Sequence, residues 1–157
     1  MSATYSPCRM VVSVAGRVIE GFSENDIVSV TRDTNLFTKT IGAAGEVARA
    51  KHCNTAGTIT ISLLQTSQDN DFLSSLANTD HATGKGQVPV YIEDQDGSTK
   101  YASTQAWVQK MPDADFGNDI RSRVWVFDCA DLSIHHGGNN TGVVASTVGA
   151  IASAFGG

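Results

Sequence analysis

Four residues near position 130 are of the kinds that bind metal ions. The thiol of Cys129, the carboxylate of Asp131 and the imidazoles of His135 and His136 lie close together in the sequence. Side chains alternate between the two faces of a strand, so His136 would lie opposite the other three, and the spacing matches no zinc-ligand pattern. We therefore expect no metal site here, and no other motif indicates a cofactor.

Other groups that could do chemistry lack the surroundings that the chemistry needs. Ser, His and Asp are all present, but no G-x-S-x-G motif places a serine at a strand-to-helix turn. Gly84-Lys85-Gly86 does not have the spacing of a phosphate-binding loop. Asp113, Asp115 and Asp119 crowd a loop and could bind a cation, but a solvated acidic turn is the simpler interpretation. We therefore predict that the protein is not an enzyme.

The composition is typical of one globular domain. The chain has 157 residues, 41% of them hydrophobic and 17% charged, and no apolar run approaches the ~20 residues that span a bilayer. Its 11 basic against 16 acidic side chains give a net charge of -5, which disfavours a protein that grips phosphate backbones. The N-terminal residues carry no basic segment with an apolar core, so we expect no cleaved signal peptide. The well-separated Cys8, Cys53 and Cys129 predict reduced, mostly buried thiols.

The elements that would position these groups are mainly β-strands. Residues 10–15 and 18–22 predict a hairpin with a type II′ turn at Gly16-Arg17. Residues 27–32 and 36–41 alternate apolar and polar side chains, which predicts two half-buried strands, and residues 46–56 have no clear period and are assigned to a loop.

A strand followed by a helix is predicted in the middle of the chain. Ile59, Ile61 and Leu63 alternate with polar residues, and Thr66 or Ser67 could cap a short helix that ends before Gly84. Strands follow at 88–93, 100–110 and 121–134, with a turn at 94–97. Because apolar residues occupy both alternating sets in 121–134, that strand is predicted to be buried on both faces.

The composition changes at residue 137. Residues 137–157 contain no charge and are dominated by Gly, Ala, Ser, Thr and Val, which is not the composition of a solvated disordered tail. We expect a β domain over 1–136 and a C-terminal tail over 137–157 that docks on its own domain or on a neighbouring copy.

Two stretches carry a resemblance to a known family. "GRVIEGFSENDIVSVTRD" at 16–33 and "NTAGTITISLLQTSQDNDFLSSL" at 54–76, followed by a strand-rich C-terminal half, resemble the inner tail tube proteins of long-tailed bacteriophages. The likeness is greatest to contractile-tailed phages and to the tube subunits of phage-derived bacteriocins, and covers roughly residues 10–134. It implies a mainly β, two-sheet β-sandwich or barrel-like fold with one short flanking helix.

The resemblance also implies a function. Six copies would form a ring, and stacked rings would form a hollow tube in the virion that conducts the phage genome into the host. The implied partners are further copies, the tail sheath, the baseplate and the tail terminator, with transient passage of DNA and no membrane. Assembly would take place in the host cytoplasm. A polar wall without cations or aromatic side chains would let DNA slide past.

Two sets of site residues follow from strand alternation under this interpretation. We expect one set to face the channel: Ser29, Thr31, Asp33, Thr58, Thr60 and Ser62. We expect the other to contact a neighbouring subunit or the next ring: Leu36, Phe37 and Ile41.

Other functions remain open at the level of sequence. A tube subunit of a type VI secretion or other contractile injection apparatus would share the same pattern. A small β-domain hydrolase or a sugar-binding module is the alternative from a different class, and would stay monomeric and bind a ligand.

Overall fold

The computed structural model describes residues 3–24 and 27–139, which form ten β-strands, a 3₁₀ turn at Pro7–Arg9 and one α-helix. The strands are β1 Met10–Val14, β2 Arg17–Val18, β3 Val28–Arg32, β4 Phe37–Ile41, β5 Val47–Lys51, β6 Gly57–Leu64, β7 Val88–Asp94, β8 Lys100–Lys110, β9 Ser122–Cys129 and β10 Leu132–His135; the helix, α1, is Asp69–Thr83. In this described part, no helix has the length and apolar character needed to cross a membrane.

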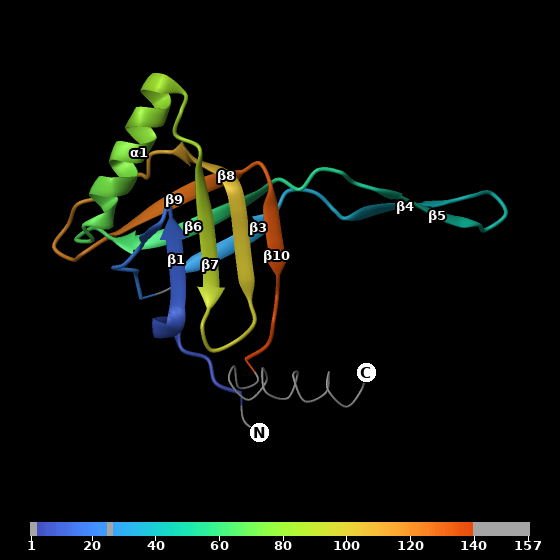
Figure 1. The fold of residues 1–157 in the computed structure, drawn as a ribbon, viewed down its shortest axis with the longest axis horizontal. Helices are drawn as coiled ribbons and strands as arrows, with labels where there is room; N and C mark the ends of the chain where they lie inside the picture. Colours follow the sequence, from blue (N-terminus) through green and yellow to red (C-terminus); the bar gives the residue numbers. More distant parts are fainter. Residues whose placement is uncertain (1–2, 25–26, 140–157) are drawn as a thin grey trace.

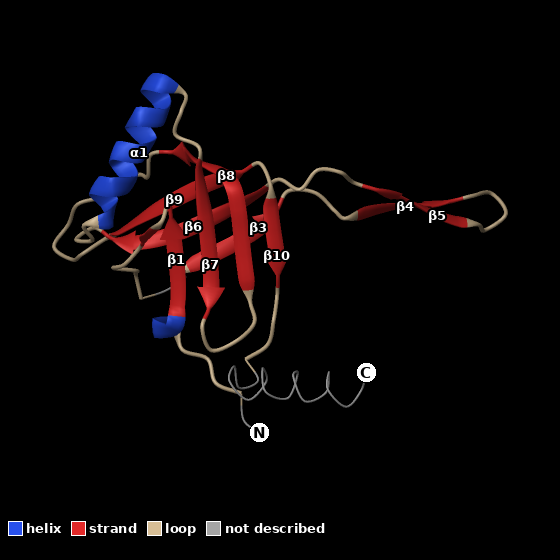
Figure 2. Cartoon of the chain, viewed as in Figure 1, coloured by secondary structure: helices blue, strands red, loops and turns tan. Residues whose placement is uncertain are grey.

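Eight of the strands form one antiparallel sheet that folds into two layers. The order is β2-β1-β7-β8-β9-β6-β3, and β10 also pairs with β8. The long strand β8 belongs to both layers, because Lys100–Ser103 pair with β10 whereas Ala106–Lys110 pair with β9. Figures 1 and 2 show β1, β7, β8 and β10 crossing over β3, β6 and β9. The predicted mainly β, two-sheet sandwich with one flanking helix is confirmed.

The core lies between the two layers and follows from strand alternation. Ile59, Ile61 and Leu63 of β6 are fully buried, as predicted. Trp125 and Phe127 of the neighbouring strand β9 lie beside them on the same buried face, because Ile61 pairs with Trp125 and Ile59 with Phe127. Buried residues of β1 and β7 close the core from the other layer: Val12, Val14, Val90 and Ile92.

Helix α1 covers one end of the sandwich. Leu73 is buried in the core, and Asn70 Oδ1 accepts a 2.9 Å hydrogen bond from Trp125 Nε1. The helix ends at Thr83, before Gly84 as predicted, and Gly84 is its C-cap with a left-handed φ of 70°. The residue at the N-cap is Gln68, which makes no side-chain cap bond. Of the two predicted cap residues, Ser67 does bind the helix start, because its Oγ accepts a 3.3 Å hydrogen bond from Asp69 N. Ser67 Oγ also donates to Glu20 O at 2.7 Å, tying the helix entrance to the first hairpin.

The segment around residues 36–52 differs most from expectation. β4 and β5 pair with each other in a separate two-stranded sheet, and every residue of both strands is exposed. Figure 1 shows this hairpin, here called the arm (residues 36–52), projecting away from the sandwich. The strand predicted at 36–41 is confirmed as β4, but it is exposed and not half-buried, and the loop predicted at 46–56 is wrong over Val47–Lys51, which form β5. Alternation indicates a strand but does not say whether its apolar face has a covering partner within the same chain.

The predicted strand 121–134 is also wrong in part, because it is divided into β9 and β10. Asp131 lies at the division, and its carboxylate accepts hydrogen bonds from Thr104 N at 3.2 Å, Gln105 N at 3.1 Å and Ser103 Oγ at 3.1 Å, and another from Thr104 Oγ1. These bonds hold the middle of β8 where it passes from β10 to β9. The outer face of β9 is not buried, since Val124 is 46% exposed.

The first hairpin has a different turn from the predicted one. Its central residues are Ala15 and Gly16, with φ of 55° and 82°. Two positive φ values define a type I′ turn, shifted by one residue from the predicted type II′ turn. A left-handed conformation is unfavourable for alanine because its Cβ crowds the following carbonyl oxygen.

We predict that Ala15→Asn stabilises the protein by about 0.5–1 kcal/mol, since asparagine tolerates the left-handed region and Asn-Gly is the preferred type I′ pair. Urea unfolding followed by circular dichroism measures the change. Ala43→Asn, in the exposed turn of the arm where φ is not positive, is the matched control and should have little effect. Equal changes in both variants would contradict strain at Ala15.

We predict that Asp131→Asn lowers the free energy of unfolding at pH 7 by roughly 1–3 kcal/mol, because it removes charge-assisted bonds to β8. The hydrogen bond from Thr104, with the others from Ser103, Thr104 and Gln105, lowers the pKa of Asp131. A lowered pKa means that the carboxylate stabilises the fold above about pH 4 and that this contribution is lost as the pH falls further. The difference between the two proteins should therefore shrink below pH 4, and a constant difference would contradict the assignment.

Candidate assembly surfaces

The four residues near position 130 do not gather into a metal site. Cys129 is buried in the core, and this burial raises the pKa of its thiol. The Asp131 carboxylate is already engaged with β8, and Tyr101 Oη lies 2.8 Å from His136 Nδ1. His135 is exposed at the end of β10. Within residues 3–24 and 27–139, no group of three or more His, Cys, Asp or Glu side chains is placed to hold a metal ion.

The cysteines are less buried than predicted. Cys8 and Cys53 are exposed, and only Cys129 is buried. Cys8 lies in the 3₁₀ turn before β1, and Cys53 follows the arm. Both positions are outside the sandwich core, which is why hydrophobic burial does not reach them.

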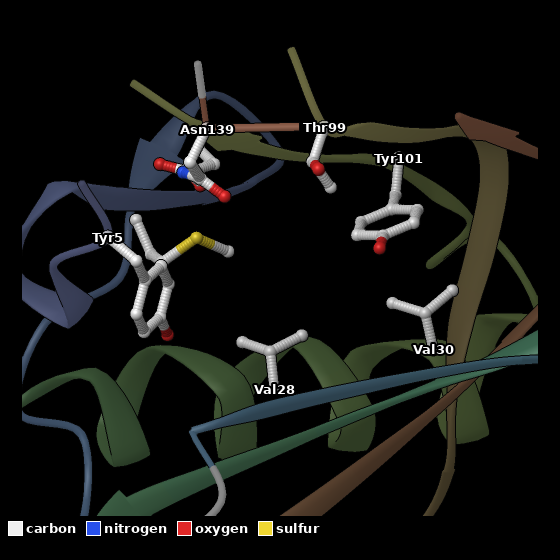
Figure 3. Close-up of a pocket in the computed structure, with 8 residues that line it drawn as sticks. Tyr5, Val28, Val30, Thr99, Tyr101 and Asn139 are labelled. Atoms are coloured by element: carbon white, nitrogen blue, oxygen red, sulfur yellow. The ribbon is translucent and has the colours of Figure 1, made fainter. Parts of the chain in front are cut away.

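A cavity of about 250 Å³ opens between the layers at the end away from α1 (Figure 3). Its lining residues are Tyr5, Met10, Val28, Val30, Asp94, Thr99, Tyr101 and Asn139. The polar groups at its rim hold the chain just before the C-terminal segment: Asn139 Nδ2 donates to Asp94 Oδ2 and Thr99 Oγ1 donates to Gly137 O at 3.1 Å. Because these groups are hydrogen-bonded to one another, they fix residues 137–139 against the ends of β7 and β8. The predicted docking of 137–157 concerns mostly residues 140–157, which lie outside the described part.

The residues predicted to face the channel come together on one surface. Ser29 pairs with Thr60 and Thr31 with Thr58, so the two strands, which were assigned separately, present a single polar face. Ser62 continues this face along β6, and Asp33 follows directly after β3. We call this surface the β3–β6 face. It is the side of the layer opposite the core, because Val30 and Ile59, which pair with each other, point inward.

Strand β9 extends the β3–β6 face with less polar residues. Thr60 pairs with Val126 and Ser62 with Val124, while Thr58 pairs with Asp128. Where the sheet continues into β8, Trp107 pairs with Asp128 and Lys110 with Val126. The face is therefore polar along β3 and β6 and becomes mixed toward β8, where it includes an aromatic side chain and a cation. Reasoning on single strands missed these residues because they depend on which strands are neighbours.

The arm presents two different sides. Register places one set of residues on one side, alternating apolar and cationic: Phe37, Lys39, Ile41, Val47, Arg49 and Lys51. Within the two strands the other side carries small residues, Thr38, Thr40, Ala48 and Ala50, and the imidazole of His52, which follows β5, is hydrogen-bonded to Thr38 Oγ1. Arg49 stacks over the Phe37 ring, with its guanidinium carbon 4.1 Å from the ring centroid. The predicted contact residues Phe37 and Ile41 share the first side, and Leu36, just before β4, is 64% exposed. The cations of β5 were missed because residues 46–56 had been assigned to a loop.

The fold resembles those of tube and cap proteins of contractile injection systems. The anti-feeding prophage tube terminating cap is similar with a TM-score of 0.63 and 14% identity, covering 86% of this chain and 93% of that chain. The sheath-tube complex of the extracellular contractile injection system PVC contains a chain that is similar with a TM-score of 0.60 and 14% identity, covering 84% and 91% of the two chains. At this identity the likeness concerns the fold alone.

Sequence comparison identifies the family. Structural protein ORF10 of Pseudomonas phage KPP10 is 32% identical over 146 residues, which are 88% of this chain and 84% of that protein. Residues 4–137 match the family described as Bacteriophage PhiTE tail tube protein. That match includes the whole sandwich and the arm, and the resemblance seen in the two quoted stretches is confirmed. The chain thus belongs to the tail tube protein family of bacteriophage PhiTE.

Proposed function

We propose that this tail tube subunit forms hexameric rings that stack into a hollow tube and that the phage genome passes through the tube. The observation that carries the proposal is the arm, whose two strands are exposed at every residue. A lone two-stranded hairpin is marginal in water. The arm becomes stable, and its apolar side chains become buried, when a neighbouring copy covers it.

Open strand edges favour the same arrangement. β3 lies at the end of the sheet order and pairs only with β6 among the described strands. Its free edge offers backbone N–H and C=O groups that a strand of a neighbouring copy could pair with. If six copies continue the layer in this way, the joined layers close into a barrel and the edge of β3 is no longer exposed.

We assign the β3–β6 face to the channel. The residues of this face on β3 and β6 have short polar side chains. Its charged residues, Asp33 after β3 and Asp128 on β9, are both acidic, so this part of the face offers no cation to which DNA phosphates could bind. Trp107 and Lys110 lie where the sheet turns into β8, and Lys110 Nζ is 3.7 Å from Asp113 Oδ1, which partly neutralises it.

The implied partners are a sheath around the tube, a baseplate at one end and a terminator at the other. The structural neighbours come from a sheath-tube complex, a sheath/tube terminator and a tube terminating cap, which supports the sheath and the terminator as partners. The phage origin of the similar sequence favours passage of a genome over passage of protein effectors.

We predict that Phe37→Asp prevents tube growth, because it places a charge within the apolar side of the arm. Purified wild-type protein should form rings or tubes in negative-stain micrographs, and the variant should not, while its far-ultraviolet circular dichroism stays unchanged. Tyr91→Asp is the matched control, since Tyr91 is also aromatic and has a similar exposure, 37% against 41% for Phe37, but lies on β7. A wild-type protein that stays monomeric at high concentration would contradict the proposed assembly.

We predict that Thr60→Lys slows DNA release from assembled particles and that this effect weakens as salt is added, because the new cations attract phosphates through a screened interaction. The rate of release across ionic strength is the measurement. Ser133→Lys, on the exposed side of β10 in the other layer, adds the same charge away from the β3–β6 face and is the control. If particles built from the Thr60→Lys variant release DNA at the wild-type rate at low salt, this face does not line the channel.

A further inference from the structure

We propose that the arm of one copy binds the loop of residues 111–120 of a second copy. This proposal rests on self-assembly of the tube subunit and names the surface that receives the arm. The loop, here called the acidic loop, connects β8 to β9 and all its residues except Pro112 are exposed.

The arm supplies a basic and apolar surface. It contains Lys39, Arg49 and Lys51 against the single acid Glu46, a net charge of +2, so the rest of this chain of net charge -5 carries -7. The cations alternate with apolar residues on one side of the hairpin, and Ile41 and Val47 of that side are 63% and 66% exposed. Such a surface fits a partner that is both acidic and apolar.

The acidic loop has the complementary composition. Asp113, Asp115 and Asp119 are its only charged residues, and they are interspersed with Met111, Phe116 and Ile120. Phe116 is 83% exposed, the highest value among the large hydrophobic side chains of the described residues. Three cations flank the loop: Lys110 lies 3.7 Å from Asp113, Arg123 stacks over Phe116 at 5.1 Å, and Arg121 follows Ile120. Asp115 and Asp119 make no described salt bridge with any of them.

Exposed apolar side chains are concentrated in these two segments. Of the eleven exposed large hydrophobic residues in the described part of the chain, four belong to the arm and three to the acidic loop. Charged side chains around them would keep the free subunit in solution, and pairing would bury both apolar sets at once. Opposite charge then selects this pairing over arm-to-arm or loop-to-loop contact.

Position in the fold requires that the contact join two copies. After the arm the chain re-enters the sandwich at Gly57, the first residue of β6, whereas after the acidic loop it re-enters at Ser122, the first residue of β9, which pairs with Leu64, the last residue of β6. Seven residue steps of strand separate these ends, about 23 Å at about 3.3 Å per residue. Figure 1 shows the arm pointing away from the end of the sandwich that carries α1 and the β8–β9 connection. A contact between two different surfaces repeats from copy to copy, and so generates a closed ring or a growing stack.

Charge reversal tests the proposal. In the arm variant, Lys39→Glu with Arg49→Glu, an acidic arm faces an acidic loop; in the loop variant, Asp113→Lys with Asp119→Lys, a basic arm faces a basic loop. Each variant alone should need at least roughly tenfold more protein than wild type to form tubes, because attraction becomes repulsion at each contact. Sedimentation across a concentration series, with negative-stain microscopy, measures this threshold.

Mixing the two variants gives the decisive result. In an equimolar mixture each acidic arm can meet a basic loop and each basic arm an acidic loop, so tubes should form again near the wild-type threshold, and less completely at high salt. The control mixes the arm variant with a protein that combines the arm substitutions Lys39→Glu and Arg49→Glu with Glu20→Lys and Asp71→Lys, at two exposed acids outside the acidic loop. Both arms and both loops in this mixture are acidic, so tubes should not form. Far-ultraviolet circular dichroism checks that every variant is folded.

The outcomes separate this proposal from the proposed function. Wild-type protein that never assembles contradicts the proposed function itself. An arm variant that assembles at the wild-type threshold, or a mixture that stays unassembled while wild type forms tubes, overturns the arm–loop pairing and leaves self-assembly intact. Recovery with the Glu20 and Asp71 control protein would also overturn it, because any basic patch would then suffice as the partner of the acidic arm.

Discussion

The two-sided pattern of β6 is the constraint on which the rest of the structure depends. Its apolar residues Ile59, Ile61 and Leu63 are fully buried, and its intervening polar residues are partly exposed on the opposite side. β6 pairs along its length with β9 and, over its first half, with β3, so its register sets which side chains of both neighbours point inward. A shift of one residue would exchange the core for the polar surface. The register of β6 therefore determines both which residues form the core and which form the β3–β6 face.

Sequence reasoning succeeded where local chemistry decides the structure. Alternation identified β6, β7 and β8, and the left-handed Gly84 ended the helix as expected. It failed where a long-range partner decides. The division of 121–134 depends on the Asp131 carboxylate reaching the backbone of β8 some 26 residues away, which no local pattern contains. The type I′ turn puts an alanine at positive φ, against the local preference.

For the candidate surfaces, the sequence predicted the polar residues of the β3–β6 face but only one strand of the arm. The polar residues of β3 and β6 were assigned to a common role from two separate strands, and their pairing in the sheet brings them onto one face. The residues predicted to contact a neighbour, Leu36, Phe37 and Ile41, lie in the arm, but the second strand of the arm was not predicted, because Val47–Lys51 gave too weak a periodic signal to separate it from a loop. A strand that packs only against its hairpin partner has little reason to alternate core and surface residues, so periodicity is least informative at such surfaces.

Because β8 belongs to both layers, the two layers of the sandwich depend on each other during unfolding. Loss of either layer would leave part of β8 without hydrogen-bond partners, because one part pairs with β10 and another with β9. The sandwich should therefore unfold as a single cooperative unit. Among residues 3–24 and 27–139 the strands of the arm pair only with each other, with His52 N bonded to Leu36 O at 3.0 Å near the base, and no arm residue belongs to the core. In the free subunit, amide hydrogens thus fall into two kinetic classes, slow exchange throughout the sandwich and fast exchange along the arm.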